Sequence, residues 1–150
     1  SESVLRELAE LLYKYRGQGK KIYLISDDAY KKLIYENIQP PNIFSIYDLV
    51  ISVTSHSKDL ALPGERIGYI AISPEIKDVD MLISGLMFSS RALGFVNAPA
   101  LFQRVVGKFQ RNSVDINEYQ KKRDVLYNAL VEAGFECIKP MGALLSLIPI

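Results

Sequence analysis

Apolar side chains recur at intervals of three and four residues near the start of the chain. The positions concerned are Val4, Leu5, Leu8, Leu11, Leu12 and Tyr15. This spacing puts them on one face of a helix and predicts a surface helix with one buried side. Ser3 is expected to cap its start, and Gly17 to lie just past its end.

Three short runs of apolar and β-branched residues predict strands, at residues 21–26, 49–54 and 66–72. The first two runs are apolar enough to predict buried strands. Helical patterns then fill residues 76–91, 99–111 and 115–133, and a last apolar run covers 143–148. Because strands alternate with helices early and helices dominate late, we expect an α/β fold, a three-layer α/β/α arrangement around a mostly parallel sheet.

Composition narrows the chemistry that the chain can perform. Its 150 residues carry 18 Lys+Arg and 17 Asp+Glu, and this balance argues against nucleic acid as a partner. The most apolar stretch, residues 81–102, is interrupted by polar residues, so we expect no membrane span and a cytoplasmic protein. Cys137 and His56 are the only residues of their types, which excludes within this chain the zinc sites that need two imidazoles or several cysteines, so no metal is expected.

Polar side chains follow the first two predicted strands at the point where each strand ends. Asp27 and Asp28 come after the first run, and the segment from Ser55 to Lys58 comes after the second. In open α/β sheets, ligands bind beyond the carboxyl ends of the strands. An acid and an amine are therefore predicted at one edge of the sheet.

The spacing within these segments resembles that of the fold-type I, pyridoxal-phosphate-dependent aminotransferases of the aspartate aminotransferase class. In that family an Asp is followed three residues later by a Tyr, and a Ser-x-x-Lys segment is followed by an Arg eight residues after the Lys. The matching residues here are Asp27, Tyr30, Ser55, Lys58 and Arg66. We therefore expect the chain to be part of the family's large domain.

The resemblance implies a role for each of these residues toward pyridoxal 5'-phosphate. Lys58 would attach the cofactor as a Schiff base and act as the general base. Asp27 would keep the pyridine nitrogen protonated, and Tyr30 would donate to the ring's phenolic oxygen. Ser55 and Arg66 would bind the phosphate. An amino acid and a 2-oxo acid are the implied substrates, and a homodimer is the implied assembly.

The resemblance also implies that the chain is a central fragment of such an enzyme. Residues 1–139 match the large cofactor-binding domain, and residues 140–150 match the start of the junction to the small domain. The family's phosphate-cradling loop, ring-stacking aromatic and substrate-carboxylate Arg are not matched, and residues 144–150 depart from the aromatic-rich pattern expected there. We expect the chain alone to be inactive or a poor catalyst.

Other interpretations stay open at this point. The fragment could be a non-catalytic structural or interaction module of the same fold, and the cofactor also serves lyases and decarboxylases. A serine acyl-transferase would need Ser-Asp-Asn and Lys-Thr-Gly beside the Ser-x-x-Lys segment, and this sequence has neither. His56 matches a variable position, so we expect it to pack in the loop or at the pocket edge. Asp28 is expected to point away from Asp27.

Overall fold

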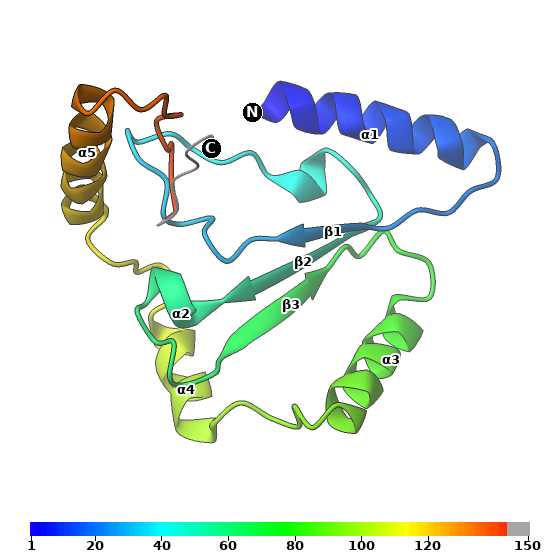
Figure 1. Ribbon diagram of the computed structural model, residues 1–150. Helices are drawn as coiled ribbons and strands as arrows, with labels where there is room; N and C mark the ends of the chain where they lie inside the picture. The colour runs from blue at the N-terminus through cyan, green and yellow to red at the C-terminus, as the bar shows by residue number, and fades with distance from the viewer. Residues whose placement is uncertain (144–150) are drawn as a thin grey trace.

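The computed structural model describes residues 1–143 (Figure 1). Its strands are β1 (Leu24–Asp27), β2 (Val50–Ser55) and β3 (Gly68–Ile72). Its helices are α1 (Glu2–Gly17), the single turn α2 (His56–Asp59), α3 (Val79–Ala92), α4 (Ala100–Lys108) and α5 (Ile116–Glu132), with a 3-10 turn at Ile43–Ser45. The apolar run predicted at 143–148 and the predicted junction at 140–150 lie largely outside the described residues.

The strands form one sheet in the order β1-β2-β3. β1 and β2 are parallel, with Asp27 opposite Val53, whereas β2 and β3 are antiparallel, with Ser55 opposite Gly68. The α/β class is confirmed, and the described sheet is mixed, with one parallel and one antiparallel pairing. β3 reverses direction because residues 56–67 contain only the short α2, while a parallel crossover needs a dozen or more residues and usually a full helix.

The core lies where α1 and the segment before β2 meet the sheet. Its buried residues are Ala9, Ile43, Ile46, Tyr47, Leu49, Val50, Ile51 and Ile76. The Tyr47 hydroxyl is satisfied inside this core, because it donates a 2.7 Å hydrogen bond to the Ile22 carbonyl. Tyr13 packs edge-on against the Tyr47 ring, with centroids 5.0 Å apart, and so joins α1 to the core.

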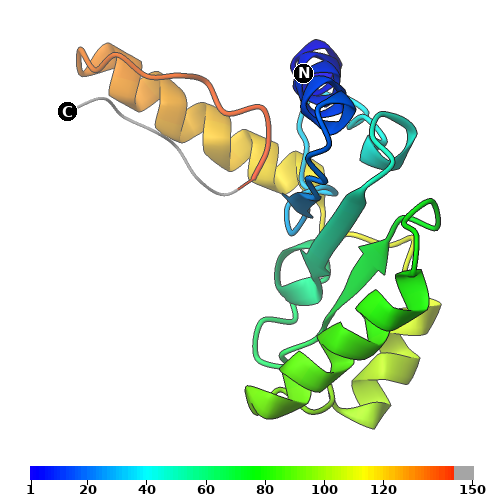
Figure 2. The same ribbon diagram turned by 90° about the vertical axis from the view of Figure 1, so that its right-hand side faces the viewer.

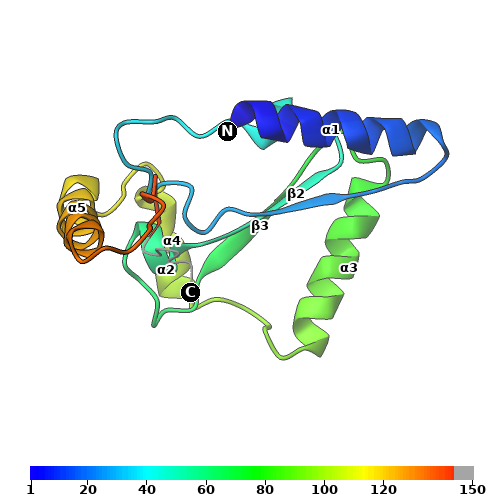
Figure 3. The ribbon, with the colours of Figure 1, turned by 45° about the horizontal axis from the view of Figure 1, so that its top comes forward.

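The helices are distributed along the two sides of the sheet. α1 runs along the β1 side, and α3 and α4 lie on the β3 side (Figures 1 and 2). α5 lies away from α1 and α3, near the ends of β1 and β2 where α2 begins. The tilted view in Figure 3 shows the same arrangement. Within residues 1–143, none of the helices combines the length and apolar character that crossing a membrane requires.

The described sheet is less covered than its apolar sequence predicts. Only the first half of β2 is buried; Ile25 in β1 is 67% exposed, and Ile70 in β3 is 43% exposed. α3 has no buried residue, and its Phe88 is 74% exposed. The described residues therefore leave apolar side chains of β1 and α3 exposed to solvent.

The residues that flank α1 and α5 show how these helices begin and end. The residue that precedes α1 is Ser1, so the prediction that Ser3 caps this helix is wrong by two positions. Asp115 caps α5 as its side chain accepts a 2.9 Å hydrogen bond from the Asn117 amide. Gly134 follows α5 with a φ of +89°, the left-handed conformation that glycine adopts without strain.

Candidate active site

The predicted site residues lie at one edge of the sheet because β1 and β2 are parallel. β1 ends at Asp27, and β2 ends at Ser55 and leads directly into α2, which carries Lys58. Ser55 caps α2: its side-chain oxygen accepts a 3.1 Å hydrogen bond from the Ser57 amide and lies 2.7 Å from the Ser57 hydroxyl. The hydroxyl predicted to bind phosphate therefore sits at the start of the turn that carries the lysine.

Lys58 and Tyr30 come together although 28 positions separate them. The Lys58 ammonium lies 5.8 Å from the centroid of the Tyr30 ring, within the range of a cation–π contact. Both side chains are only half-buried, so a ligand could reach them. The structure thus brings one residue of each sequence segment into contact.

The two adjacent acids have different surroundings. Asp27 is exposed, and its Oδ1 accepts a 3.2 Å hydrogen bond from the Ala29 amide. Asp28 is half-buried and accepts hydrogen bonds from the Ser26 and Ser52 hydroxyls at 2.7 and 2.6 Å. Asp28 is thus held by the sheet, whereas Asp27 has only the Ala29 amide as a hydrogen-bond partner among residues 1–143.

Arg66 lies in the loop that returns the chain from α2 to β3. Its guanidinium donates a 2.8 Å hydrogen bond to the Pro63 carbonyl, and its backbone has a φ of +50°. The next residue, Ile67, accepts a 3.0 Å hydrogen bond from the His56 amide, which holds the loop against the start of α2. Among residues 1–143, no hydrogen bond or ion pair joins Asp27, Ser55 or Arg66 to the Lys58 amine.

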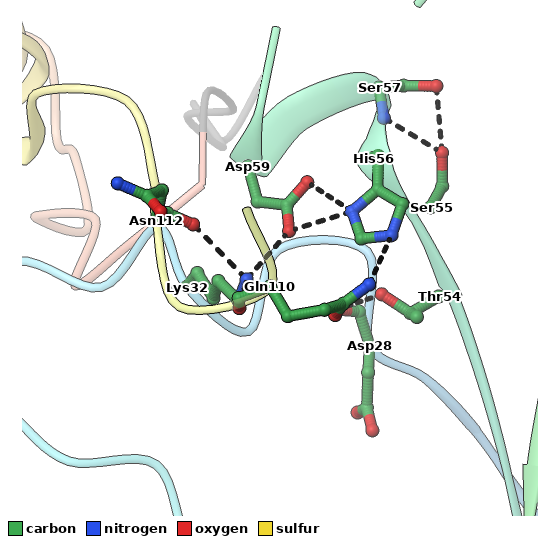
Figure 4. Close-up of polar contacts among 9 residues, drawn as sticks. All are labelled: Asp28, Lys32, Thr54, Ser55, His56, Ser57, Asp59, Gln110 and Asn112. Atoms are coloured by element: carbon green, nitrogen blue, oxygen red, sulfur yellow. Dashed lines mark hydrogen bonds and ion pairs between the residues drawn. The ribbon is translucent and has the colours of Figure 1, made fainter. Parts of the chain in front are cut away.

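A polar cluster beside Lys58 is the part of this region that the sequence did not indicate (Figure 4). We call it the Lys32–Asp59 clasp; its members are Lys32, His56, Asp59, Gln110 and Asn112. The Asp59 carboxylate, 7% exposed, lies 3.2 Å from Lys32 Nζ and 3.2 Å from His56 Nδ1. Lys32 also donates to the carbonyls of Gln110 and Asn112, at 2.6 and 3.2 Å.

His56 is a packed member of this cluster. The residue is 2% exposed, and its ring lies against Tyr69 with centroids 5.8 Å apart. Its Nδ1 faces both Asp59 oxygens, and its Nε2 lies 3.5 Å from the Gln110 side-chain nitrogen. The tautomer that carries its proton on Nδ1 would donate to Asp59 and accept from Gln110, so both ring nitrogens have partners.

Comparison with known proteins identifies the family of the chain. The sequence profile of the family "Aminotransferase class I and II" matches residues 4–150. The chain belongs to this family. An amino transferase from Eubacterium rectale of known crystal structure is 40% identical and superposes with a TM-score of 0.90, over 95% of this chain and 36% of that one.

Further aminotransferases show the same relationship at lower identity. An aspartate aminotransferase double mutant from Thermus thermophilus shares the fold, with a TM-score of 0.77 at 24% identity over 99% of this chain and 38% of that one. A probable aspartate/prephenate aminotransferase of Thermus aquaticus is 31% identical over 95% of this chain and 36% of its own length. The chain thus spans about a third of the length of the aminotransferases that it matches.

The residues present fit the cofactor that the aminotransferase class I and II family implies. Lys58 offers a primary amine, Tyr30 a phenol, Asp27 an exposed carboxylate, Ser55 a hydroxyl and Arg66 a guanidinium. These five side chains would suit four groups of pyridoxal phosphate: the aldehyde, the phenolic oxygen, the ring nitrogen and, for Ser55 and Arg66 together, the phosphate. The chemistry of these side chains is therefore compatible with the cofactor.

Proposed function

We propose that this chain forms part of the cofactor site of a pyridoxal-phosphate-dependent aminotransferase, which moves an amino group between an amino acid and a 2-oxo acid. The observation that carries the proposal is the approach of Lys58 Nζ to the Tyr30 ring, 5.8 Å from its centroid, at the edge where parallel β1 and β2 end. This is the position at which open α/β sheets bind ligands.

Each side chain has a defined task in the proposed site. Pyridoxal phosphate, when bound, supplies an aldehyde and an electron-withdrawing ring. Lys58 provides the amine that attaches the cofactor, and once released it moves the proton at the α-carbon of the substrate. Asp27 holds a proton at the ring nitrogen, because a carboxylate favours the charged form of a neighbouring base. Tyr30 donates to the phenolic oxygen, and Ser55 and Arg66 hold the phosphate.

The proposal includes an arrangement of domains and subunits. Residues 1–139 would belong to the large cofactor-binding domain, and residues 140–150 would begin the junction to the small domain. The exposed apolar side chains of α3, including Phe88 at 74%, support burial against further polypeptide in a homodimer. The single cysteine, which can form no disulfide within the chain, supports a cytoplasmic location.

Covalent labelling tests the proposal directly. The chain is incubated with pyridoxal phosphate, reduced with borohydride, digested and mapped for pyridoxyl-lysine. The label should concentrate on Lys58 and disappear in Lys58→Ala. Lys122→Ala is the matched control, because Lys122 Nζ also lies over a tyrosine ring, 5.4 Å from the centroid of Tyr119, but on exposed α5.

Two outcomes would contradict the assignment. One is labelling of Lys122 and other surface lysines to the same extent as Lys58, which would mean ordinary amine reactivity. The other is an undiminished pyridoxal phosphate affinity in Lys58→Ala, measured by the change in cofactor absorption.

A further inference from the structure

The acid that follows Lys58 directly is buried and fully engaged. Asp59 is buried and contacts two cationic or proton-donating groups, Lys32 Nζ and His56 Nδ1, each at 3.2 Å. A carboxylate removed from water is strongly destabilising unless it is paired and hydrogen-bonded. The position of Asp59 therefore depends on those partners.

Lys32 is held from three directions. Its ammonium contacts Asp59 Oδ2 at 3.2 Å, the Gln110 carbonyl at 2.6 Å and the Asn112 carbonyl at 3.2 Å. Three acceptors use all three N–H donors of an ammonium group. Lys32 thus has a partner for each of its three donors, although its side chain is 33% exposed.

The clasp and the Tyr30–Lys58 contact connect the same two segments of the chain. Lys32 lies two residues after Tyr30, and Asp59 lies one residue after Lys58. The single turn α2 has too few internal hydrogen bonds to hold its own position. Its place is set by contacts outside it, including the hydrogen bond from the Val114 amide to the Asp59 carbonyl, 2.8 Å.

We propose that Lys32 and Asp59 are positioning residues, which hold the Lys58 amine against Tyr30 and thereby set how well Lys58 attaches pyridoxal phosphate. Neither residue needs to touch the cofactor. The effect on cofactor attachment rests on the proposed function. The effect of Lys32 and Asp59 on the position of α2 can be measured without cofactor.

The test compares Lys32→Met and Asp59→Asn with the conservative variant Lys32→Arg, which keeps the cation and its donors. Borohydride trapping of pyridoxal phosphate on Lys58 should fall about tenfold in the first two variants, as expected for losing one coupled interaction. The double variant should lose no more than either single one, and Lys32→Arg should restore most of the labelling. Lys121→Met is the control, because Lys121 pairs with Glu118 on exposed α5.

A second readout works without cofactor. Hydrogen exchange of the backbone amides at residues 57–62 should accelerate by about tenfold in Lys32→Met and Asp59→Asn. Without the Lys32–Asp59 ion pair, this segment opens locally more often. Exchange in α1 and β2 should stay unchanged, which separates loss of position from loss of fold. Thermal unfolding of every variant completes the comparison.

The outcomes separate the two proposals. If Lys58 of the unmodified chain takes no label, the proposed function fails for this chain, and the exchange data alone decide the positioning role. Unchanged exchange at 57–62 in both variants would overturn that role. So would undiminished labelling of Lys58 in a folded Lys32→Met, or failure of Lys32→Arg to restore labelling.

Discussion

The Ser52 hydroxyl donates a 2.6 Å hydrogen bond to the Asp28 carboxylate and so connects β2 to the residue that follows β1. The Thr54 hydroxyl adds a 3.3 Å hydrogen bond to the Asp28 carbonyl, drawn in Figure 4. These contacts hold the chain at the point where Asp27 leaves the sheet. Asp28 thus holds the strand end, whereas exposed Asp27 contributes only its hydrogen bond with the Ala29 amide among the described residues.

Ser52→Ala should therefore destabilise the chain, because it removes a donor from a half-buried carboxylate. We expect a loss of about 1–2 kcal/mol in the free energy of unfolding. Urea denaturation of Ser52→Ala, Asp28→Asn and the double variant should give a coupling of about 1 kcal/mol. Ser84→Ala, at an exposed position of α3, is the control. Strict additivity of the two single effects would contradict a direct contact.

Gly68 is required by the close approach of β3 to β2. A Cβ at this position would lie 2.2 Å from the Thr54 carbonyl oxygen, which is backbone and cannot rotate away. Gly68→Ala should cost about 2–3 kcal/mol of stability, measured by urea denaturation. Gly64→Ala is the matched control, because a Cβ there meets nothing within 4 Å, and it should change stability by less than about 0.5 kcal/mol. Equal effects of the two substitutions would show that β3 can move aside.

Much of the fold could be predicted from the sequence because its signals are local. Helical periodicity located α3, α4 and α5 to within a few residues at each end, and the three apolar runs located the strands similarly. The antiparallel direction of β3 was not predicted, although the link between the two predicted strands, residues 55–65, is short for a parallel crossover that carries a full helix. The exposure of Ile25 was also missed, because burial depends on which elements cover the sheet.

The site shows the same division between local and distant information. Ser55, Lys58 and Arg66 lie within one short segment, and the resemblance of their spacing to the aminotransferase motif implied a cofactor role, which remains a prediction. The clasp has no such signature, because Lys32 meets Asp59 across 27 positions and the Gln110 carbonyl across 78. The left-handed backbone of Arg66 carried no signal either, since glycine is the residue that usually marks this conformation.

Tyr47 should make the chain sensitive to alkali. Burial, followed by the nearby Asp48 charge, raises the pKa of Tyr47 above its ordinary value of 10.0. The folded state therefore binds this proton more tightly than the unfolded state does. The resulting stability is fully present below about pH 10 and is lost as the pH rises through the folded pKa.

Tyr47→Phe isolates this contribution. Near neutral pH the variant should be less stable by about 1 kcal/mol, because the hydrogen bond to the Ile22 carbonyl is lost. Above about pH 10 its stability should decline less steeply than that of the unmodified chain. Some decline should persist, since burial also raises the pKa of Tyr35. Urea denaturation at several pH values checks this, and parallel curves for the two proteins would contradict it.

Arg66 combines a strained backbone with a proposed phosphate contact, and substitution can separate the two. Because a left-handed conformation disfavours any residue with a Cβ, Arg66→Gly should be more stable than Arg66→Ala by about 1 kcal/mol. Both variants lose the guanidinium and should lose pyridoxal phosphate affinity to the same extent. Ala61→Gly, at a φ of +54°, should gain similar stability without affecting that affinity. If Arg66→Gly binds the cofactor as well as the unmodified chain does, the phosphate contact of Arg66 is refuted. If only Arg66→Ala binds more weakly, the loss of affinity comes from backbone strain and not from loss of the guanidinium.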